Sequence, residues 1–199
     1  DDPRHARFRK IVSAGFTPRM MASLMDGVER TATEVVDRIA GLGECDFVTE
    51  VASRLPLVII CDMMGIDPDR YDEVFHLSNI VLSNGDPEYI DPEDNPLEAF
   101  LKAGAGLAEI MNETAEARRG GDGTDLTSML VNAEVDGERL TNEELASFFV
   151  LLCVAGNETT RTAISWGLEY LTQNPEQRAI WLNDIEGVTP SAVEEIVRM

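Results

Sequence analysis

The sequence predicts a mostly α-helical fold, and three observations support that prediction. Helix-start signals, each a capping side chain followed by proline, recur along the chain. Segments rich in Gly, Asn, Pro or Asp separate the helical stretches as loops. A capping box, Thr141-Asn-Glu-Glu144, opens the longest apolar pattern in the chain. The start signals are Asp2-Pro3, Thr17-Pro18, Asp67-Pro68, Asn174-Pro175 and Thr189-Pro190.

The expected helices follow these signals in order. Between them, residues 83–96 and 119–123 are expected as loops, and 135–138 as a turn, because Gly, Asn, Pro and Asp gather there. The longest expected helix, about 142–173, would be roughly 48 Å long at ~1.5 Å per residue, so it should cross the middle of the domain. The expected helices are 3–14, 18–41, 47–64, 70–82, 97–118, 125–133 and about 142–173.

Composition narrows the class of protein. The chain has 199 residues, 44% of them apolar, which suits one globular domain with a core. Its net charge of -21 disfavours binding to nucleic acid or to anionic membranes. No apolar run is long enough for a membrane span, and no signal peptide is visible, so we expect a cytoplasmic protein. The chain begins at Asp1 and ends inside a predicted helix, which we interpret as an internal piece of a longer protein.

The most informative motif is Ala155-Gly156-Asn157-Glu158-Thr159-Thr160, inside the long predicted helix. Helical spacing puts Leu151, Val154, Ala155, Glu158 and Thr159 on one face, which is apolar and then abruptly polar. An acid, a hydroxyl and a water beside them would form a proton relay. Gly156 would let a large flat group approach the backbone. The alternative is an ordinary amphipathic helix, with Glu158 in solvent and paired with Arg161.

Two further pairs lie at helical spacing near the ends of the chain. His5 and Arg9 are four residues apart beside an apolar stripe, an arrangement that suits an amphipathic ligand with carboxylate or phosphate tails. The alternative is a solvated basic helix. Glu195 and Arg198 are three residues apart and could form an ion pair, which at a surface contributes under ~1 kcal/mol.

Taken in order along the chain, the three motifs resemble the cytochrome P450 family of haem-thiolate monooxygenases. The start is D-P-x-H-x-x-x-R, the middle is A-G-N-E-T-T and the end is E-x-x-R. The stretches 55–65 and 125–137 are also similar to soluble bacterial members. The resemblance covers essentially the whole chain and implies the central helical part of one such domain, 1–199, truncated at both ends.

The resemblance implies a role for each matching residue. His5 and Arg9 match residues that bind the haem propionates, and Ala155 and Gly156 match the point where the long helix passes over the haem. Glu158 and Thr159 match the acid and alcohol that deliver protons for oxygen activation. Leu151 and Val154 match substrate-facing positions. Glu195 and Arg198 match a structural pair.

The chain departs from the family pattern at the iron ligand. That ligand is a cysteine in a Phe- and Gly-rich loop well after the E-x-x-R motif, and this chain ends one residue after Arg198. None of Cys45, Cys61 and Cys153 has the expected context. They form neither a zinc motif nor a disulfide framework, so we expect reduced thiols and no metal site in this chain. The chain alone is therefore expected to be inactive.

The complete protein is expected, from the resemblance, to bind haem b and to take electrons from a ferredoxin-type partner. It would insert one oxygen atom into an apolar small molecule of sterol, terpene or fatty acyl type, and it would be a monomer. The alternative from a different class is an acidic all-helical binding or scaffold protein without redox chemistry.

Overall fold

The computed structural model describes residues 4–16, 18–83, 85–134 and 137–199 and confirms a mostly α-helical fold. In these ranges η1 is a π-helix, η2 is a 3-10 helix, and the other elements are α-helices. In chain order they are α1 Arg4–Gly15, α2 Pro18–Ile39, η1 Val48–Ala52, α3 Arg54–Met64, η2 Pro68–Arg70, α4 Tyr71–Leu82, α5 Pro96–Arg118, α6 Leu126–Asn132, α7 Asn142–Gln173, α8 Pro175–Asn183 and α9 Ile185–Arg198.

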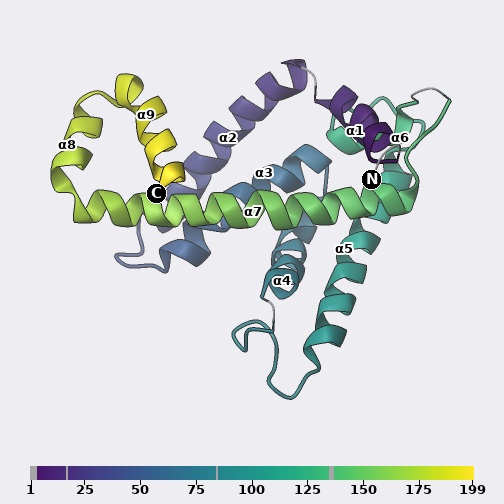
Figure 1. Cartoon of the computed structure of the whole chain (residues 1–199), viewed down its shortest axis with the longest axis horizontal. Coiled ribbons are helices and arrows are strands. Elements are labelled where there is room, and N and C mark those ends of the chain that lie inside the picture. The colour runs from purple at the N-terminus through teal and green to yellow at the C-terminus, as the bar shows by residue number, and fades with distance from the viewer. Residues whose placement is uncertain (1–3, 17, 84, 135–136) are drawn as a thin grey trace.

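The long central helix is α7, and its bounds are those predicted (Figure 1). Both bonds of the capping box are present. The Glu144 backbone N–H donates to the Thr141 hydroxyl at 3.1 Å, and the Thr141 N–H donates to the Glu144 carboxylate at 3.1 Å. These bonds pair N–H groups that have no partner within the helix, which fixes where α7 begins.

The core lies around the N-terminal half of α7. Helices α3, α4 and α5 pack against it, and α6 packs against α5. Phe149 and Cys153 of α7 are fully buried among apolar side chains of these helices. Beyond Asn157, Gly167 is the one buried residue of α7, and no residue of α8 or α9 is buried among those described. The two halves of α7 therefore meet different surroundings.

The expected helix 47–64 is divided in the structure into η1 and α3, and Pro56 explains the break. A proline has no N–H to donate, and its ring clashes with the carbonyl four residues earlier. That residue is Ala52, where η1 ends. Ser53 lies between the two elements, and its N–H donates to the Val48 carbonyl at 2.8 Å, five residues back.

The prediction that Thr189-Pro190 starts a helix is wrong, because Pro190 lies inside α9. The helix begins earlier because Asp184 caps it, accepting a bond from the Gly187 N–H at 3.0 Å. Thr189 instead accepts a bond from the Trp181 indole N–H at 2.8 Å. The Asn174-Pro175 signal does start α8, and Asp67-Pro68 starts η2. The signals at 2–3 and 17–18 and the turn at 135–138 fall wholly or partly outside the described residues.

Candidate functional site

Three of the candidate site residues of α7 lie along the side of the helix that its neighbours leave open. Leu151, Ala155 and Thr159 are exposed at successive spacings of four, with Leu151 56% exposed. Phe149, Cys153 and Asn157 occupy the opposite, buried side at the same spacing. Since α7 carries small and apolar side chains on its open side, that side is available to contact a further apolar group.

The acid and the hydroxyl of the motif are held differently. The Thr159 hydroxyl donates to the Ala155 carbonyl at 2.8 Å, the interaction by which a helical Thr loosens the preceding turn. Glu158 forms an ion pair with Arg161, as the alternative interpretation expected, and its side chain is 39% exposed. The pairing does not remove Glu158 from the open side of the helix, because Glu158 and Thr159 both line the groove described below.

The structure shows that Gly156 faces a close neighbour, which the sequence did not indicate. A Cβ at this position would lie 3.1 Å from the Ile60 Cδ1 atom of α3. The glycine therefore allows α3 and α7 to approach closely. Val154 is half-buried at the border between the two sides. On the open side, next to Gly156, the surface is formed by Ala155. Alanine has a small side chain and the highest helix propensity, so it leaves space without weakening the helix.

Helix α1 lies at the N-terminal end of α7 (Figure 1). The rings of Phe8 and Phe148 meet edge to face with centroids 5.9 Å apart, and Arg7 forms ion pairs with Glu144 and Glu138. His5 and Arg9 are exposed, and neither has a hydrogen-bond or ion-pair partner among the described residues. Arg7 and Phe8 attach the helix, which leaves His5 and Arg9 as uncommitted donors.

The last candidate pair is formed as predicted. Two nitrogens of the Arg198 guanidinium donate to the two carboxylate oxygens of Glu195 at 2.7 and 2.6 Å. This fork-to-fork geometry lowers the pKa of Glu195, chiefly through the hydrogen bond from Arg198. Both side chains are exposed on α9.

A wide groove of about 1220 Å³ follows the C-terminal half of α7 and is closed on one side by α8 and α9. Glu158 and Thr159 form its polar end, and most of the remaining wall is apolar. Gly167 lets α9 approach, since a Cβ there would lie 3.1 Å from the Ile196 Cδ1 atom. The acid, the hydroxyl and an apolar surface therefore meet in one concave region.

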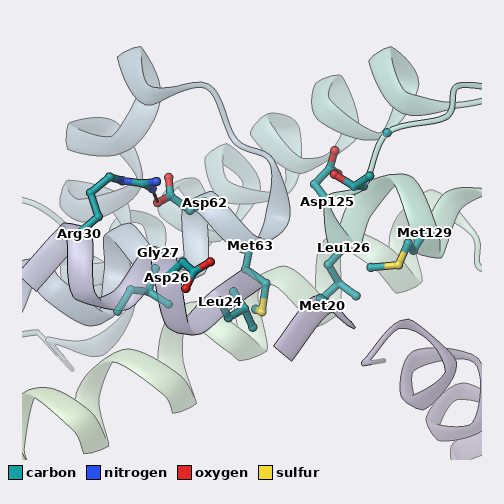
Figure 2. Close-up of a pocket in the computed structure, with 13 residues that line it drawn as sticks. Met20, Leu24, Asp26, Gly27, Arg30, Asp62, Met63, Asp125, Leu126 and Met129 are labelled. Carbon is teal, nitrogen blue, oxygen red and sulfur yellow. Dashed lines mark hydrogen bonds and ion pairs between the residues drawn. The ribbon is translucent and has the colours of Figure 1, made fainter. Parts of the chain in front are cut away.

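A second hollow, of about 640 Å³, lies between α2, α3 and the segment leading into α6 (Figure 2). Its apolar part includes Met20, Met63 and Met129, and Arg30 reaches Asp62 across its rim at 3.3 Å. None of the candidate residues predicted from the sequence lines this hollow. It is therefore separate from the α7 groove.

The cysteines do not form a site. Cys61 and Cys153 are fully buried in the core, and Cys45 is exposed near the start of η1. Burial raises the pKa of the Cys153 thiol to about 12 and raises that of Cys61 well above its usual range. Both buried thiols are therefore protonated at neutral pH.

Two further residues of this region, Asn157 and Arg161, are not among the site residues that the sequence predicts. Asn157 is fully buried, and neither polar atom of its amide has a hydrogen-bond partner among the described residues. The sequence indicates Arg161 only as a partner for Glu158, and in the structure it also lines a hollow together with Glu88 and Tyr89. Its spacing from Glu158 is visible in the sequence, but its proximity to residues 88–89 depends on the fold.

Comparisons with known proteins agree with this arrangement. The family model for cytochrome P450 matches residues 1–195. The chain is 47% identical over 201 residues to the methyl-branched lipid omega-hydroxylase of Mycobacterium tuberculosis, covering 100% of this chain and 46% of that protein. It is 37% identical over 198 residues to a steroid C26-monooxygenase of Mycolicibacterium smegmatis, covering 100% and 44%.

Solved structures that resemble this chain are also cytochrome P450 enzymes. A Mycobacterium marinum cytochrome P450 in complex with pseudoionone superposes with a TM-score of 0.89 at 44% identity, covering 100% of this chain and 48% of that one. A Bacillus megaterium enzyme in complex with corticosterone superposes with a TM-score of 0.87 at 27% identity, covering 100% and 52%.

The helical fold, the ordered motifs and the family match define the class: this chain belongs to the cytochrome P450 family. It spans about half the length of the relatives that it matches. The comparisons give no support to the alternative of a helical scaffold without redox chemistry. Among the described helices, none combines the length and apolarity needed to cross a bilayer.

Proposed function

We propose that this chain is part of a haem-dependent monooxygenase that hydroxylates an apolar small molecule, using O₂ and electrons from a redox partner. The observation that carries the proposal is the open side of α7, where Glu158 and Thr159 stand at the polar end of an apolar groove. In a member of this family, such a surface is suited to contact both a flat cofactor and an apolar substrate.

The residues present fit haem b. Haem has an apolar body and two carboxylate tails, and α1 offers two donors, His5 and Arg9, without partners among the described residues. Thr159 is eleven positions beyond Phe148, which contacts α1, or about 16 Å along the helix at 1.5 Å per residue. That separation suits a large planar group. Ala155 would contact its face, and Gly156 would hold this part of α7 against α3.

When bound, haem would supply the redox-active iron at which dioxygen is activated. Thr159 and Glu158 of this chain would deliver protons beside the haem. The Thr159 hydroxyl, bonded to the Ala155 carbonyl, would hold a water on the open side of α7. The adjacent Glu158 carboxylate would resupply that water with protons from solvent, since its side chain is partly exposed. The iron ligand would come from a cysteine outside this chain.

Leu151, about two turns before Thr159, and Val154, between one and two turns before it, would contact the substrate. The names of the relatives support a lipid or sterol: one is a methyl-branched lipid omega-hydroxylase and another a steroid C26-monooxygenase. We further propose that residues 1–199 are one part of a single domain, and that the complete protein is a cytoplasmic monomer served by a ferredoxin-type donor. Glu195 and Arg198 would bind a later part of the chain.

A direct test of the function uses the full-length protein with a ferredoxin and its reductase. We expect hydroxylated product from a methyl-branched fatty acid or a sterol, detected by mass spectrometry. The reduced protein treated with CO should show the red-shifted Soret band of a thiolate-ligated haem. Haem incorporation without that band, together with no product from either substrate class, would contradict the proposal.

The propionate role predicts the effect of removing Arg9. In the full-length protein, Arg9→Ala should lower the ratio of haem to polypeptide after purification, because it deletes a charge-assisted hydrogen bond worth about 1.5–3 kcal/mol. Lys10→Ala serves as the control, since it removes a neighbouring charge from the same helix. If Arg9→Ala retained haem as the parent does but altered substrate preference, the propionate assignment would be wrong.

A further inference from the structure

Glu144 is a buried acid near the start of α7, and its two carboxylate oxygens have different partners. Its side chain is 9% exposed, and a charge taken from water requires polar partners that offset the lost hydration. The Oε2 atom accepts the Thr141 N–H at 3.1 Å and so completes the capping box. The Oε1 atom pairs with the Arg7 guanidinium of α1, which lies 137 residues earlier in the chain. One carboxylate therefore both caps α7 and holds α1.

Arg7 is bound on two of its nitrogens. The Nε atom lies 3.1 Å from a carboxylate oxygen of Glu138, in the segment before α7, and a terminal nitrogen pairs with Glu144. Because the guanidinium is a planar fork, two acids on two of its nitrogens fix its orientation as well as its position. The next residue, Phe8, meets Phe148 of α7 edge to face. A charged and an apolar contact on consecutive residues thus place α1 on the first two turns of α7.

The seating of α1 determines where its two exposed donors lie. His5 and Arg9 come two residues before and two residues after Arg7, within the one helix Arg4–Gly15. An α-helix moves as a stiff unit, so a shift at Arg7 displaces both donors together. Ile11, further along α1, is buried in the core, so the helix is also attached independently of the ion pair. Loss of the pair should therefore misplace the donors rather than release the helix.

We propose that the Arg7–Glu144 ion pair positions the haem donors: it seats α1 on the capped end of α7 and thereby sets where these donors lie relative to the open side of α7. Both members are positioning residues, because each acts through another group, Glu144 through Arg7 and Arg7 through the helix that it shares with the donors. The haem part of the inference rests on the proposed function, in which His5 and Arg9 bind the propionates. The seating of α1 rests on the contacts of the fold alone.

Glu144→Gln in the full-length protein separates the ion pair from helix capping. Glutamine completes a capping box as glutamate does, because its side-chain oxygen can accept the Thr141 N–H, but it offers Arg7 no charge. We expect haem to transfer to an excess of a haem-free acceptor protein about fivefold faster than from the parent, the order expected for loss of one partly buried pair. Amide exchange at residues 142–145 should keep the parent's rate, since the cap is kept.

Arg7→Gln should speed haem transfer more, about tenfold, because it leaves the buried Glu144 carboxylate without the Arg7 charge. The double variant Arg7→Gln/Glu144→Gln should lose haem no faster than Arg7→Gln alone, since both changes remove the same pair. Arg7→Lys keeps the charge but not the planar fork, so its rate should lie between those of the parent and Arg7→Gln. Arg7→Lys takes the place of Arg7→Gln in this comparison if that variant does not fold.

Arg139→Gln is the matched control. It breaks an arginine–glutamate pair at 3.1 Å, with Glu134, but both residues lie in the connection between α6 and α7. Haem transfer in this variant should match that of the parent. Amide exchange along α1 in the same set of proteins tests the seating independently of haem binding. We expect exchange to be faster in Glu144→Gln and Arg7→Gln than in the parent, and unchanged in Arg139→Gln.

Each part of the inference has its own contradicting result. The parent's rate of α1 exchange in Glu144→Gln would overturn the seating. Faster α1 exchange with the parent's rate of haem transfer, or single effects that multiply in the double variant, would overturn the positioning of the haem donors. If His5→Ala and Arg9→Ala both retained haem as the parent does, the propionate assignment of the proposed function would fail, and the exchange along α1 would still decide the seating.

Discussion

Thr159→Ala in the full-length protein is expected to lower the product formed per reducing equivalent about tenfold or more, with hydrogen peroxide accounting for the lost electrons. The variant removes the hydroxyl that donates to the Ala155 carbonyl, and with it the group that we propose holds a water on the open side of α7. The helix should persist, because alanine has a higher helix propensity than threonine. Haem content and substrate affinity should therefore change little.

Thr172 provides a closely matched control for this experiment. It is also an exposed threonine of α7, and its hydroxyl donates to the Leu168 carbonyl at 2.8 Å, the same bond at the same length. Thr172→Ala should leave the coupling ratio unchanged. Equal coupling in the parent and in Thr159→Ala would show that the hydroxyl takes no part in proton delivery.

Glu158→Gln is expected to slow turnover on the order of 100-fold, the range typical for removing a general acid or base. Glutamine keeps the shape of the side chain and its hydrogen bond to Arg161, but it carries no titratable proton. Substrate binding should stay close to that of the parent, so the loss should appear in kcat rather than in KM. The measurement is steady-state turnover with saturating redox partner, alongside substrate titration.

Arg161→Gln is a companion variant, because it removes the ion pair with Glu158 but leaves the Glu158 carboxylate in place. If Glu158→Gln and Arg161→Gln lowered kcat equally, loss of the ion pair, and not loss of the titratable proton, would explain the slower turnover. If turnover were unaffected in Glu158→Gln, the carboxylate would have no part in proton supply.

The parts of the fold that the sequence predicted well are those fixed by local interactions. The bounds of α7 follow from Thr141 and Glu144, which cap each other's backbone within one turn. The bond from Thr159 to Ala155 and the pairs Glu158–Arg161 and Glu195–Arg198 are likewise set by helical spacing. Such contacts require only that the helix forms.

The features that the sequence did not predict depend on neighbours remote in the chain. Gly156 is required by Ile60 of α3, nearly one hundred residues earlier, and no local pattern indicates that contact. The same holds for the hollow that Tyr89 and Arg161 both line. Pro190 was misplaced for another reason, since a stronger capping residue, Asp184, starts the helix a turn and a half earlier.

The solvent deuterium isotope effect on product formation tests the central claim most directly, measured in the full-length parent and in Glu158→Gln across mixtures of H₂O and D₂O. If Glu158 and Thr159 form the proton relay on the open side of α7, the size of the effect and its dependence on deuterium fraction should both change in the variant. The same isotope effect and the same dependence in both proteins, at equal coupling, would contradict the relay.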